Sequence, residues 1–323
     1  MLRARSERYF NFERALFSVT YKHISEEVIT MQRRDFLRMV AFAALSARYC
    51  SIESLLAADV QIDDNIVAIF SDTHLHGPET VQHVVRFNQS VAKILAMNPR
   101  PANLLIYGDV AYLEGKIGEY ELFRRLIKPI EQAGIKWEIA MGNHDRIMNY
   151  RTVFPERFEK EQPVKDCYIN IVETPRADFI LLDSYLKGQV RGDICDEQRA
   201  WLTETLKKYT GKPVFVGCHH PEAETKLADI LKACPKFVAY LHGHHHYYRT
   251  PVQDGMQTIC FPSVGHWGDM GFMTVFLSEK EATFVPNIDA YQWSKYGYVK
   301  SPEEDVEKYL AMLNENSPVL SLP

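Results

Sequence analysis

Short apolar runs alternate with amphipathic segments along most of this chain, and this alternation limits the folds it can adopt. The first three runs are Ile66–Ser71, Leu104–Tyr107 and Lys136–Met141. Between them, Glu79–Met97 and Glu119–Gln132 carry apolar residues at helical spacing, and Pro129 is placed to kink the second segment. Strand, helix and strand in this order join as crossover units, so we expect parallel strands covered by helices.

The second half of the chain continues this pattern. We expect strands at Tyr168–Val172, Phe179–Asp183, Val214–Cys218 and Phe237–Leu241, and helices at Asp196–Tyr209 and Ala223–Lys232. Asp196 is the expected N-cap of its helix. Through about Val285, short strands alternate with turns marked by Gly and Pro. The predicted fold class is α/β, with two mixed β-sheets packed as a sandwich flanked by helices in αββα order. One domain should cover residues 60–290, followed by a tail over 291–323 with a short helix.

Residues 31–58 read as a targeting segment. Arg33–Leu37 (RRDFL) is followed by a short apolar stretch, a pattern that resembles a bacterial twin-arginine export signal with cleavage near Ala57-Ala58. Gln32 stands where such signals usually have Ser or Thr, and the alternative is an ordinary amphipathic helix. The apolar stretch is too short for a permanent membrane anchor. Residues 1–30 have no evident role in the fold. If translation starts at Met31, they are a mis-assigned extension of the chain.

The signal implies the twin-arginine translocation machinery as a partner and an exported or periplasmic protein, with the cytoplasm as the alternative. The six cysteines form no CxxC pair and do not fix the redox compartment. With 37 Lys and Arg against 42 Asp and Glu, the formal net charge is −5. No nucleic-acid partner is therefore expected.

Each of five predicted strands ends in side chains of the kind that bind metal ions. The five blocks are Asp72-Thr73-His74, Gly108-Asp109, Gly142-Asn143-His144-Asp145, His219-His220-Pro221 and His242-Gly243-His244-His245-His246. Each block alone also suits a turn, and the last suits a metal-binding tract without catalysis. Ligands gather at the carboxyl ends of strands in such sheets, so the five blocks together predict one site.

Two metal ions suit this set of residues better than one. Asp109 can bridge two cations, while Asp72 with His74 and His244 with His246 are pairs spaced two residues apart. Mixed Asp, His and Asn ligands favour Mn, Fe or Zn. Two such ions about 3.5–4 Å apart can clamp a phosphoryl group and activate a bridging hydroxide.

In this order the blocks resemble the calcineurin-like metallophosphoesterase family over about residues 66–250. The resemblance implies a β-sandwich flanked by helices. It also implies that Asp72, His74 and His246 hold one metal, that Asn143, His219 and His244 hold the second, and that Asp109 bridges them. His144 would be the catalytic residue, which stabilises charge or protonates the leaving-group oxygen. A nearby carboxylate such as Asp145 or Asp72 would orient it. His220, His242 and His245 are left outside the ligand set.

The resemblance also predicts the substrate class. Gly108–Tyr112 lacks the Arg that marks the protein phosphatases of the family, which favours its smaller cyclic-nucleotide and glycerophosphodiester phosphodiesterases. We therefore expect a hydrolase for a phosphodiester or phosphomonoester of a small molecule, with Ser263–Gly271 in the pocket wall. An inactive binding protein of the same fold is one alternative. A nuclease is another, which the acidic charge opposes.

Overall fold

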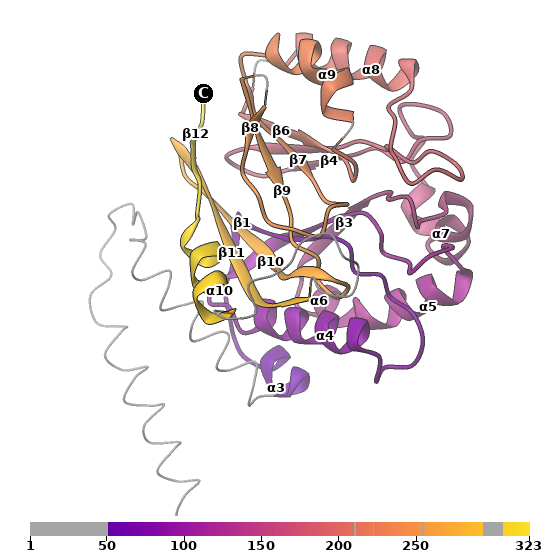
Figure 1. Cartoon of the computed structure of the whole chain (residues 1–323), viewed down its shortest axis with the longest axis vertical. Helices are drawn as coiled ribbons and strands as arrows, with labels where there is room; N and C mark the ends of the chain where they lie inside the picture. Colours follow the sequence, from indigo (N-terminus) through magenta and orange to yellow (C-terminus); the bar gives the residue numbers. More distant parts are fainter. Residues whose placement is uncertain (1–50, 210, 222, 254, 293–305) are drawn as a thin grey trace, which may run out of the picture. The chain divides into compact units, whose positions relative to one another are not determined.

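The computed structural model contains two six-stranded mixed sheets, and it describes residues 51–292 and 306–323 apart from 210, 222 and 254 (Figure 1). The first sheet has the strand order β12-β11-β10-β1-β2-β3. Its strands are β1 (Ile62–Phe70), β2 (Arg100–Tyr107), β3 (Lys136–Ala140), β10 (Gly268–Leu277), β11 (Glu281–Gln292) and β12 (Val319–Ser321). The pairs β1–β2 and β2–β3 are parallel, and the pairs that involve β10, β11 and β12 are antiparallel.

The second sheet has the order β4-β5-β6-β7-β9-β8. Its strands are β4 (Asn170–Glu173), β5 (Asp178–Leu181), β6 (Val214–Gly217), β7 (Phe237–His242), β8 (Val252–Gln253) and β9 (Met256–Cys260). The four central strands, β5, β6, β7 and β9, are parallel, and β4 and β8 close the edges antiparallel. This arrangement places the carboxyl ends of β6 and β7 next to each other.

Alternation along the strands sorts the side chains into layers. In β1, Val67 and Ile69 belong to the core between the sheets, whereas Ala68 and Phe70 belong to a core under helices. In β5, Phe179 faces the first of these cores and Ile180 faces a third, under α8 and α9. The helices are α3 (Ile52–Leu56), α4 (Gln82–Leu95), α5 (Ile117–Leu126), α6 (Lys128–Gln132), α7 (Ile147–Val153), α8 (Asp196–Lys207), α9 (Ala223–Lys232) and α10 (Val306–Glu315). The order helix, sheet, sheet, helix confirms the predicted fold class.

Two details of the helices differ from the prediction. The single helix expected over Glu119–Gln132 is two helices, because Pro129 has no N–H to continue α5 and instead lies in the first turn of α6. The expected N-cap Asp196 is wrong: Cys195 has the extended backbone of the cap, and Asp196 is the first helical residue. The short helix α7 and the 3₁₀ turn Pro155–Phe158 were not predicted.

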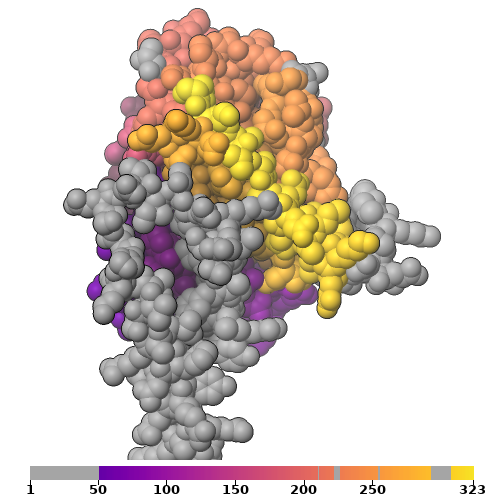
Figure 2. All heavy atoms as spheres, turned by 90° about the vertical axis from the view of Figure 1, so that its left-hand side faces the viewer, coloured from indigo at the N-terminus to yellow at the C-terminus, as the bar shows by residue number. Residues whose placement is uncertain are grey.

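The C-terminal residues pack on the first sheet. β12 pairs with β11, and α10 places Leu313, which is 2% exposed, in the core between the sheets. Asn314 fixes the helix further, since its amide accepts from the N–H of Ile288 and donates to the Ile288 carbonyl. Figure 2 shows these residues in yellow beside orange segments of the chain. The predicted terminal helix thus completes one edge of the sandwich.

Most of the predicted export signal lies outside the described residues, as does the extension over residues 1–30. Its last part is described and forms α3, which packs against α4 through the buried Leu55. The guanidinium of Arg100, itself 4% exposed, donates to the carbonyl oxygens of Leu55 and Leu95. Among the described helices, none combines the length and apolar character that crossing a bilayer requires.

Candidate active site

Loops from both sheets meet at the carboxyl ends of β1, β2, β6 and β7. The loop after β1 bonds to the loop after β2, since the N–H of Asp72 donates to the Gly108 carbonyl (3.1 Å) and that of His74 to the Asp109 carbonyl (2.9 Å). In the second sheet, the N–H of Gly243 donates to the carbonyl of His219 (3.0 Å). These backbone bonds fix the loops before any side chain contributes.

The first group of convergent side chains is Asp72, His74 and His246, all buried. Nε2 of His246 lies 3.1 Å from Oδ1 of Asp72 and 3.2 Å from Nε2 of His74. Two of the three come from the first sheet and one from the second. The structure therefore brings together the residues predicted for one metal.

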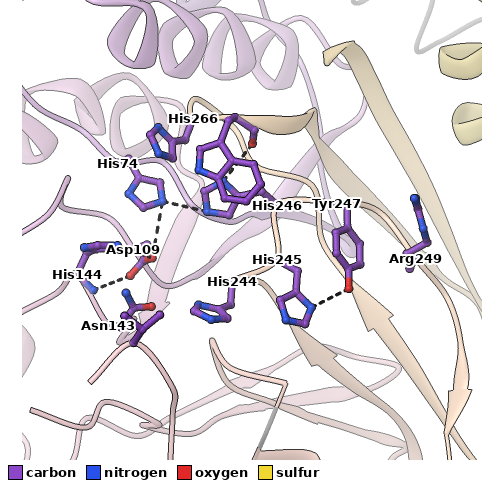
Figure 3. A pocket seen from close by; sticks show the side chains of 12 residues that line it. His74, Asp109, Asn143, His144, His244, His245, His246, Tyr247, Arg249 and His266 are labelled. Atoms are coloured by element: carbon purple, nitrogen blue, oxygen red, sulfur yellow. Dashed lines mark hydrogen bonds and ion pairs between the residues drawn. The ribbon is translucent and has the colours of Figure 1, made fainter. Parts of the chain in front are cut away.

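The second group surrounds His219. Its Nε2 lies 3.2 Å from Oδ2 of Asp109, 3.2 Å from Oδ1 of Asn143 and 3.3 Å from Nδ1 of His244. Oδ2 of Asp109 also lies 3.7 Å from Nε2 of His74, which belongs to the first group. Asp109 thus stands between the two groups, in the position expected of a bridging residue (Figure 3).

Backbone carbonyls fix the proton on three of these imidazoles. Nδ1 of His74, of His219 and of His246 lies 3.0, 2.7 and 3.1 Å from the carbonyl oxygens of Tyr112, Tyr107 and Trp267. A carbonyl can only accept, so Nδ1 carries the N–H and Nε2 keeps its lone pair. This is the orientation that metal-ligating histidines usually have.

As a result, lone pairs face lone pairs at hydrogen-bond distance. Nε2 of His74 meets Nε2 of His246, and Oδ1 of Asp72 is buried without a hydrogen-bond donor. Such a cluster is repulsive unless positive charge lies among its atoms. The donor set of carboxylate, amide and imidazole atoms fits divalent Mn, Fe or Zn.

The electrostatics point the same way. Burial lowers the pKa of His74 and of His244 to about 3, which keeps both rings neutral. Burial also disfavours charge on His219, but the carboxylates of Asp109 and Asp72 raise its pKa to about 10. Although burial opposes ionisation of Asp72, its histidine neighbours hold its pKa below the ordinary value. The two carboxylates thus favour positive charge at this position, which a bound cation would supply.

The backbone of the candidate ligands is unusual. Among the described residues other than glycine, six have positive φ, and five of them are candidate ligands: Asp72 (52°), His74 (44°), Asp109 (51°), His244 (68°) and His246 (56°). Residues with a β-carbon adopt this left-handed region at a cost, and such residues cluster at functional sites.

The glycines of the motifs make room for the ligands. A β-carbon on Gly142 would clash with Oδ1 of Asp109, and one on Gly243 would clash with the hydroxyl of Ser71. Gly108 has a φ of 80° and lies against the ring of His219. Gly108 therefore does more than form a turn, because its missing side chain also lets the ring of His219 approach the backbone closely.

His144 reaches the site from the loop after β3. Its Nε2 lies 4.0 Å from Oδ2 of Asp109, and its side chain is 27% exposed. Its Nδ1 donates to the carbonyl of Leu113 (3.0 Å), so the expectation that Asp145 or Asp72 orients it is wrong. Asp145 instead joins the loops, because it accepts N–H groups of Ala111 and Gly142 and the Tyr120 hydroxyl.

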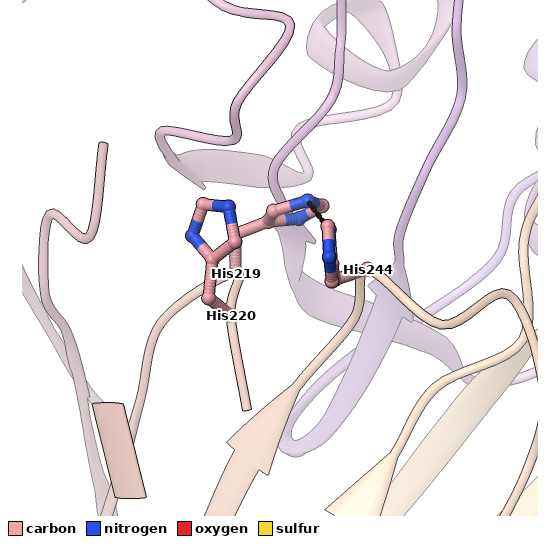
Figure 4. Close-up of side chains that lie close together, drawn as sticks. All are labelled: His219, His220 and His244. Carbon is pink, nitrogen blue, oxygen red and sulfur yellow. Dashed lines mark hydrogen bonds between the residues drawn. The ribbon is translucent and has the colours of Figure 1, made fainter. Parts of the chain in front are cut away.

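The three leftover histidines are engaged elsewhere. His220 lies beside the His219–His244 pair, with its ring centroid 4.6 Å from that of His219 and 4.8 Å from that of His244 (Figure 4). Both of its ring nitrogens have other partners, since Nδ1 lies 2.8 Å from the Ser184 hydroxyl and Nε2 3.1 Å from the Val190 carbonyl. Nδ1 of His242 bonds the Gly243 carbonyl and Nδ1 of His245 the Tyr247 hydroxyl. His242, His245 and Cys260 form a further group whose ligand-type atoms lie within 4.8 Å of one another.

A cavity of about 680 Å³ opens over the site. Its walls are His74, Asp109, Asn143, His144, Val190, His244, His245, His246, Tyr247, Arg249, His266 and Trp267. His266 and Trp267 fall in the segment expected to form the wall, and the Trp267 ring stacks on His246 with centroids 4.4 Å apart. Tyr247 and Arg249 were missed, because neither their type nor their spacing signals a site.

His83 was missed as well. Its Nδ1 donates to the carbonyl of His74 (2.8 Å), and its Nε2 lies 3.2 Å from Nδ1 of His266. This histidine thus supports the backbone of a candidate ligand from α4. Within the helical pattern of α4 it looks like any surface residue.

The sequence model of one family, Calcineurin-like phosphoesterase, matches residues 66–248. Among curated proteins, the chain is 24% identical over 256 residues to the probable glycerophosphodiester phosphodiesterase GpdQ of Arcobacter nitrofigilis, covering 71% of this chain and 89% of the relative. It is 26% identical over 224 residues to a probable cyclic nucleotide phosphodiesterase of Rhodococcus erythropolis, covering 63% and 72%.

A solved structure shares the fold. It is the purple acid phosphatase PPD1 from yellow lupin seeds, with a TM-score of 0.51 and 14% sequence identity. The match covers 73% of this chain and 53% of the lupin chain.

Proposed function

The chain belongs to the calcineurin-like phosphoesterase family and is a hydrolase of ester bonds, and we propose that it cleaves a phosphoester of a small molecule at a site for two divalent cations. Asp72, His74 and His246 would hold one cation, and Asn143, His219 and His244 the other, with Asp109 shared. Manganese, iron or zinc suits these ligands.

One observation carries this proposal. Ring nitrogens and carboxylate oxygens approach one another at 3.1–3.3 Å around two centres, and three of the four imidazoles turn their Nδ1–H outward to backbone carbonyls. A core packed only for stability would not collect acceptors in this way. Positive charge placed among them removes the repulsion at both centres.

The reaction follows from the residues around the two centres. Cations bound there supply charge for phosphoryl oxygens and acidify water. His144 lies at the wall of the cavity, within 4.0 Å of Asp109, where the protonated ring can donate from Nε2 to a phosphoryl or leaving-group oxygen. Its Nδ1–H bond to Leu113 holds the ring so that Nε2 faces the cavity.

We favour a phosphodiester over a phosphomonoester. Both curated relatives described above are named phosphodiesterases, and the cavity extends beyond the two centres along His245, Tyr247 and Arg249. A second ester substituent needs such additional room, whereas a monoester does not.

A substrate panel on the metal-reconstituted enzyme tests the proposal. The chain would be stripped of metal, reloaded with Mn²⁺, Fe²⁺ or Zn²⁺, and assayed on bis(p-nitrophenyl) phosphate beside p-nitrophenyl phosphate. We expect hydrolysis that requires metal and is faster on the diester. Asp109→Asn should lose bound metal and turnover, while the exposed Asp64→Asn should match the wild type. Metal-loaded protein that hydrolyses neither ester would overturn the proposal in favour of a binding protein.

We also propose that the protein is exported by the twin-arginine route, on the strength of Arg33–Leu37 and the apolar stretch that follows. Cleavage near Ala57-Ala58 would remove α3 and with it the bond from Arg100 to Leu55. The mass of the protein in the periplasmic and cytoplasmic fractions tests this. A mature periplasmic form that Arg33→Lys with Arg34→Lys abolishes is expected, and export without the arginines would contradict it.

A further inference from the structure

Two cysteines that the proposed reaction does not use lie side by side. Sγ of Cys167 is 3.9 Å from Sγ of Cys195, although 28 positions separate them in the chain. Cys195 is exposed and Cys167 is partly exposed, whereas the other three described cysteines are buried. Within the described residues this is therefore the pair of thiols that an oxidant can reach.

Hydrogen bonds fix the two chain segments that carry these cysteines, so the short distance between the sulfur atoms does not depend on side-chain rotamers alone. Tyr168, which follows Cys167, donates its N–H to Oδ2 of Asp183 (2.9 Å). Gln198, in the first turn of the helix that Cys195 caps, bonds the same residue twice: its Oε1 accepts the N–H of Asp183 (3.0 Å), and its Nε2 donates to the Asp183 carbonyl (2.6 Å). Both Asp183 and Gln198 are buried.

One buried residue thus anchors the two chain segments that carry the thiols. Fixed segments keep the sulfur atoms together for as long as the domain is folded, which raises the effective concentration of one thiol at the other. A bond between them would require rotation about the Cα–Cβ bonds to close the 3.9 Å between the sulfur atoms.

We propose that Cys167 and Cys195 are a dithiol site. A disulfide oxidant such as oxidised glutathione would convert the two thiols to a disulfide bond between these residues. The exposed thiolate of Cys195 attacks one glutathione sulfur and releases one glutathione thiolate. The thiolate of Cys167 then attacks Sγ of Cys195 and releases the second. Two S–H bonds are lost and one S–S bond forms between the cysteines, while the S–S bond of oxidised glutathione breaks. The two released thiolates take up, through the solvent, the two protons that the cysteines lost, which gives two molecules of reduced glutathione.

The order of attack follows from exposure. Burial, together with the carboxylate of Asp183, raises the pKa of Cys167, so it is the poorer first nucleophile. It serves instead as the resolving thiol, next to the sulfur that glutathione has already activated.

The bond would tie down a segment that reaches the active site. Residues 184–194 run from the end of β5 to Cys195 and contribute Val190 to the cavity wall. The Val190 carbonyl accepts a hydrogen bond from Nε2 of His220, and Gly192 lies against the same ring. A disulfide between Cys195 and Cys167 would hold the far end of this segment to the loop before β4.

Peptide mapping of the full chain tests the site. The folded protein would be incubated with oxidised glutathione, its remaining thiols alkylated, and its peptides analysed by mass spectrometry without reduction. We expect a cross-linked pair of peptides that contains Cys167 and Cys195, and a rise in Tm on oxidation. Cys195→Ser and Cys167→Ser should lose both signals, and Cys234→Ala should keep both.

Three results would overturn the inference: both thiols remain alkylated after oxidation, Cys195 keeps glutathione as a stable mixed disulfide, or Cys195 pairs with a second copy of the chain on a non-reducing gel. Cys195 is exposed, so its serine variant remains informative if Cys167→Ser does not fold. The measurement needs no turnover, so its outcome is independent of the proposed reaction.

Discussion

His144 differs from its neighbours in the active site because its Nε2 stands at the cavity wall, 4.0 Å from the nearest carboxylate oxygen. We predict that His144→Gln retains both metal ions and lowers kcat by about 10²- to 10⁴-fold, the usual contribution of a general acid. Metal content by mass spectrometry and steady-state kinetics measure this. His76→Gln is the matched control, since His76 stacks on Tyr112 outside the cavity lining. Loss of metal in His144→Gln would make His144 a ligand instead.

Asp183 gives a pH dependence that is separate from the active site. Burial raises its pKa from 3.8 to about 6, so the folded chain holds its proton at a pH where the unfolded chain has lost it. Stability from this group is therefore present below pH ~4 and is lost as the pH rises toward ~6, by on the order of 3 kcal/mol.

Denaturation of the wild type and Asp183→Asn at several pH values, in one metal state, measures this loss. Between pH ~4 and ~6, the free energy of unfolding of the wild type should fall relative to that of the variant. Above pH ~6, the two free energies should change in parallel. Parallel curves throughout would mean that the carboxyl titrates normally.

At the level of the elements, the strand ends were the most predictable feature. Buried runs of β-branched and aliphatic residues specify β1, β2 and β3, and the carboxyl ends of parallel strands must lie together, so Asp72, Asp109 and Asn143 could be placed from sequence. Asp196 was misplaced because Cys195, a poor cap by type, takes the cap position through its extended backbone.

Tyr247 and Arg249 show what the sequence could not supply. They line the cavity because the chain turns along it after His246. The course of the chain there depends on the pairing of β9 with β7, which the sequence does not reveal. The short helix α7 is also unpredictable from propensity, since its seven residues depend on packing for their stability.

The loop after β3 should not tolerate a methyl group. We predict that Gly142→Ala displaces Asp109 and lowers metal affinity and kcat/KM at least about 10-fold, as losses of supporting groups around metal ligands do. Gly118→Ala, in α5, is the matched change: a β-carbon there meets no atom within 4 Å and should stabilise the helix by about 0.5–1 kcal/mol. Titration with Mn²⁺ and thermal denaturation of both variants measure these effects. Normal metal binding by Gly142→Ala would contradict the close approach.

At the scale of the whole molecule, the site joins the two sheets, because each proposed cation has ligands from both. Saturating Mn²⁺ should therefore stabilise the fold, by about 2.7 kcal/mol for each bound ion when free metal exceeds its Kd about 100-fold. EDTA should reverse this shift in Tm, and Asp109→Asn should show less of it. An equal Tm with and without metal would mean that the folded chain does not bind the metal at this site.

Helix α10 should matter to stability although every strand of the sandwich except β12 precedes it in the chain. Leu313 is 2% exposed in the core, so Leu313→Ala should destabilise the chain by about 2–4 kcal/mol. Its neighbour Met312 is 54% exposed, and Met312→Ala should change stability by less than about 0.5 kcal/mol. Urea denaturation of both variants decides whether α10 belongs to the cooperative unit.

The left-handed backbone of five candidate ligands carries an evolutionary consequence. Glycine fits such a conformation without the penalty of about 1–2 kcal/mol per residue that a side chain incurs. Random drift under selection for folding alone would therefore favour glycine at Asp72, Asp109 or His244. A lineage that kept the fold but gave up hydrolysis should show this exchange first, and its proteins should melt at higher temperature than their active ancestors.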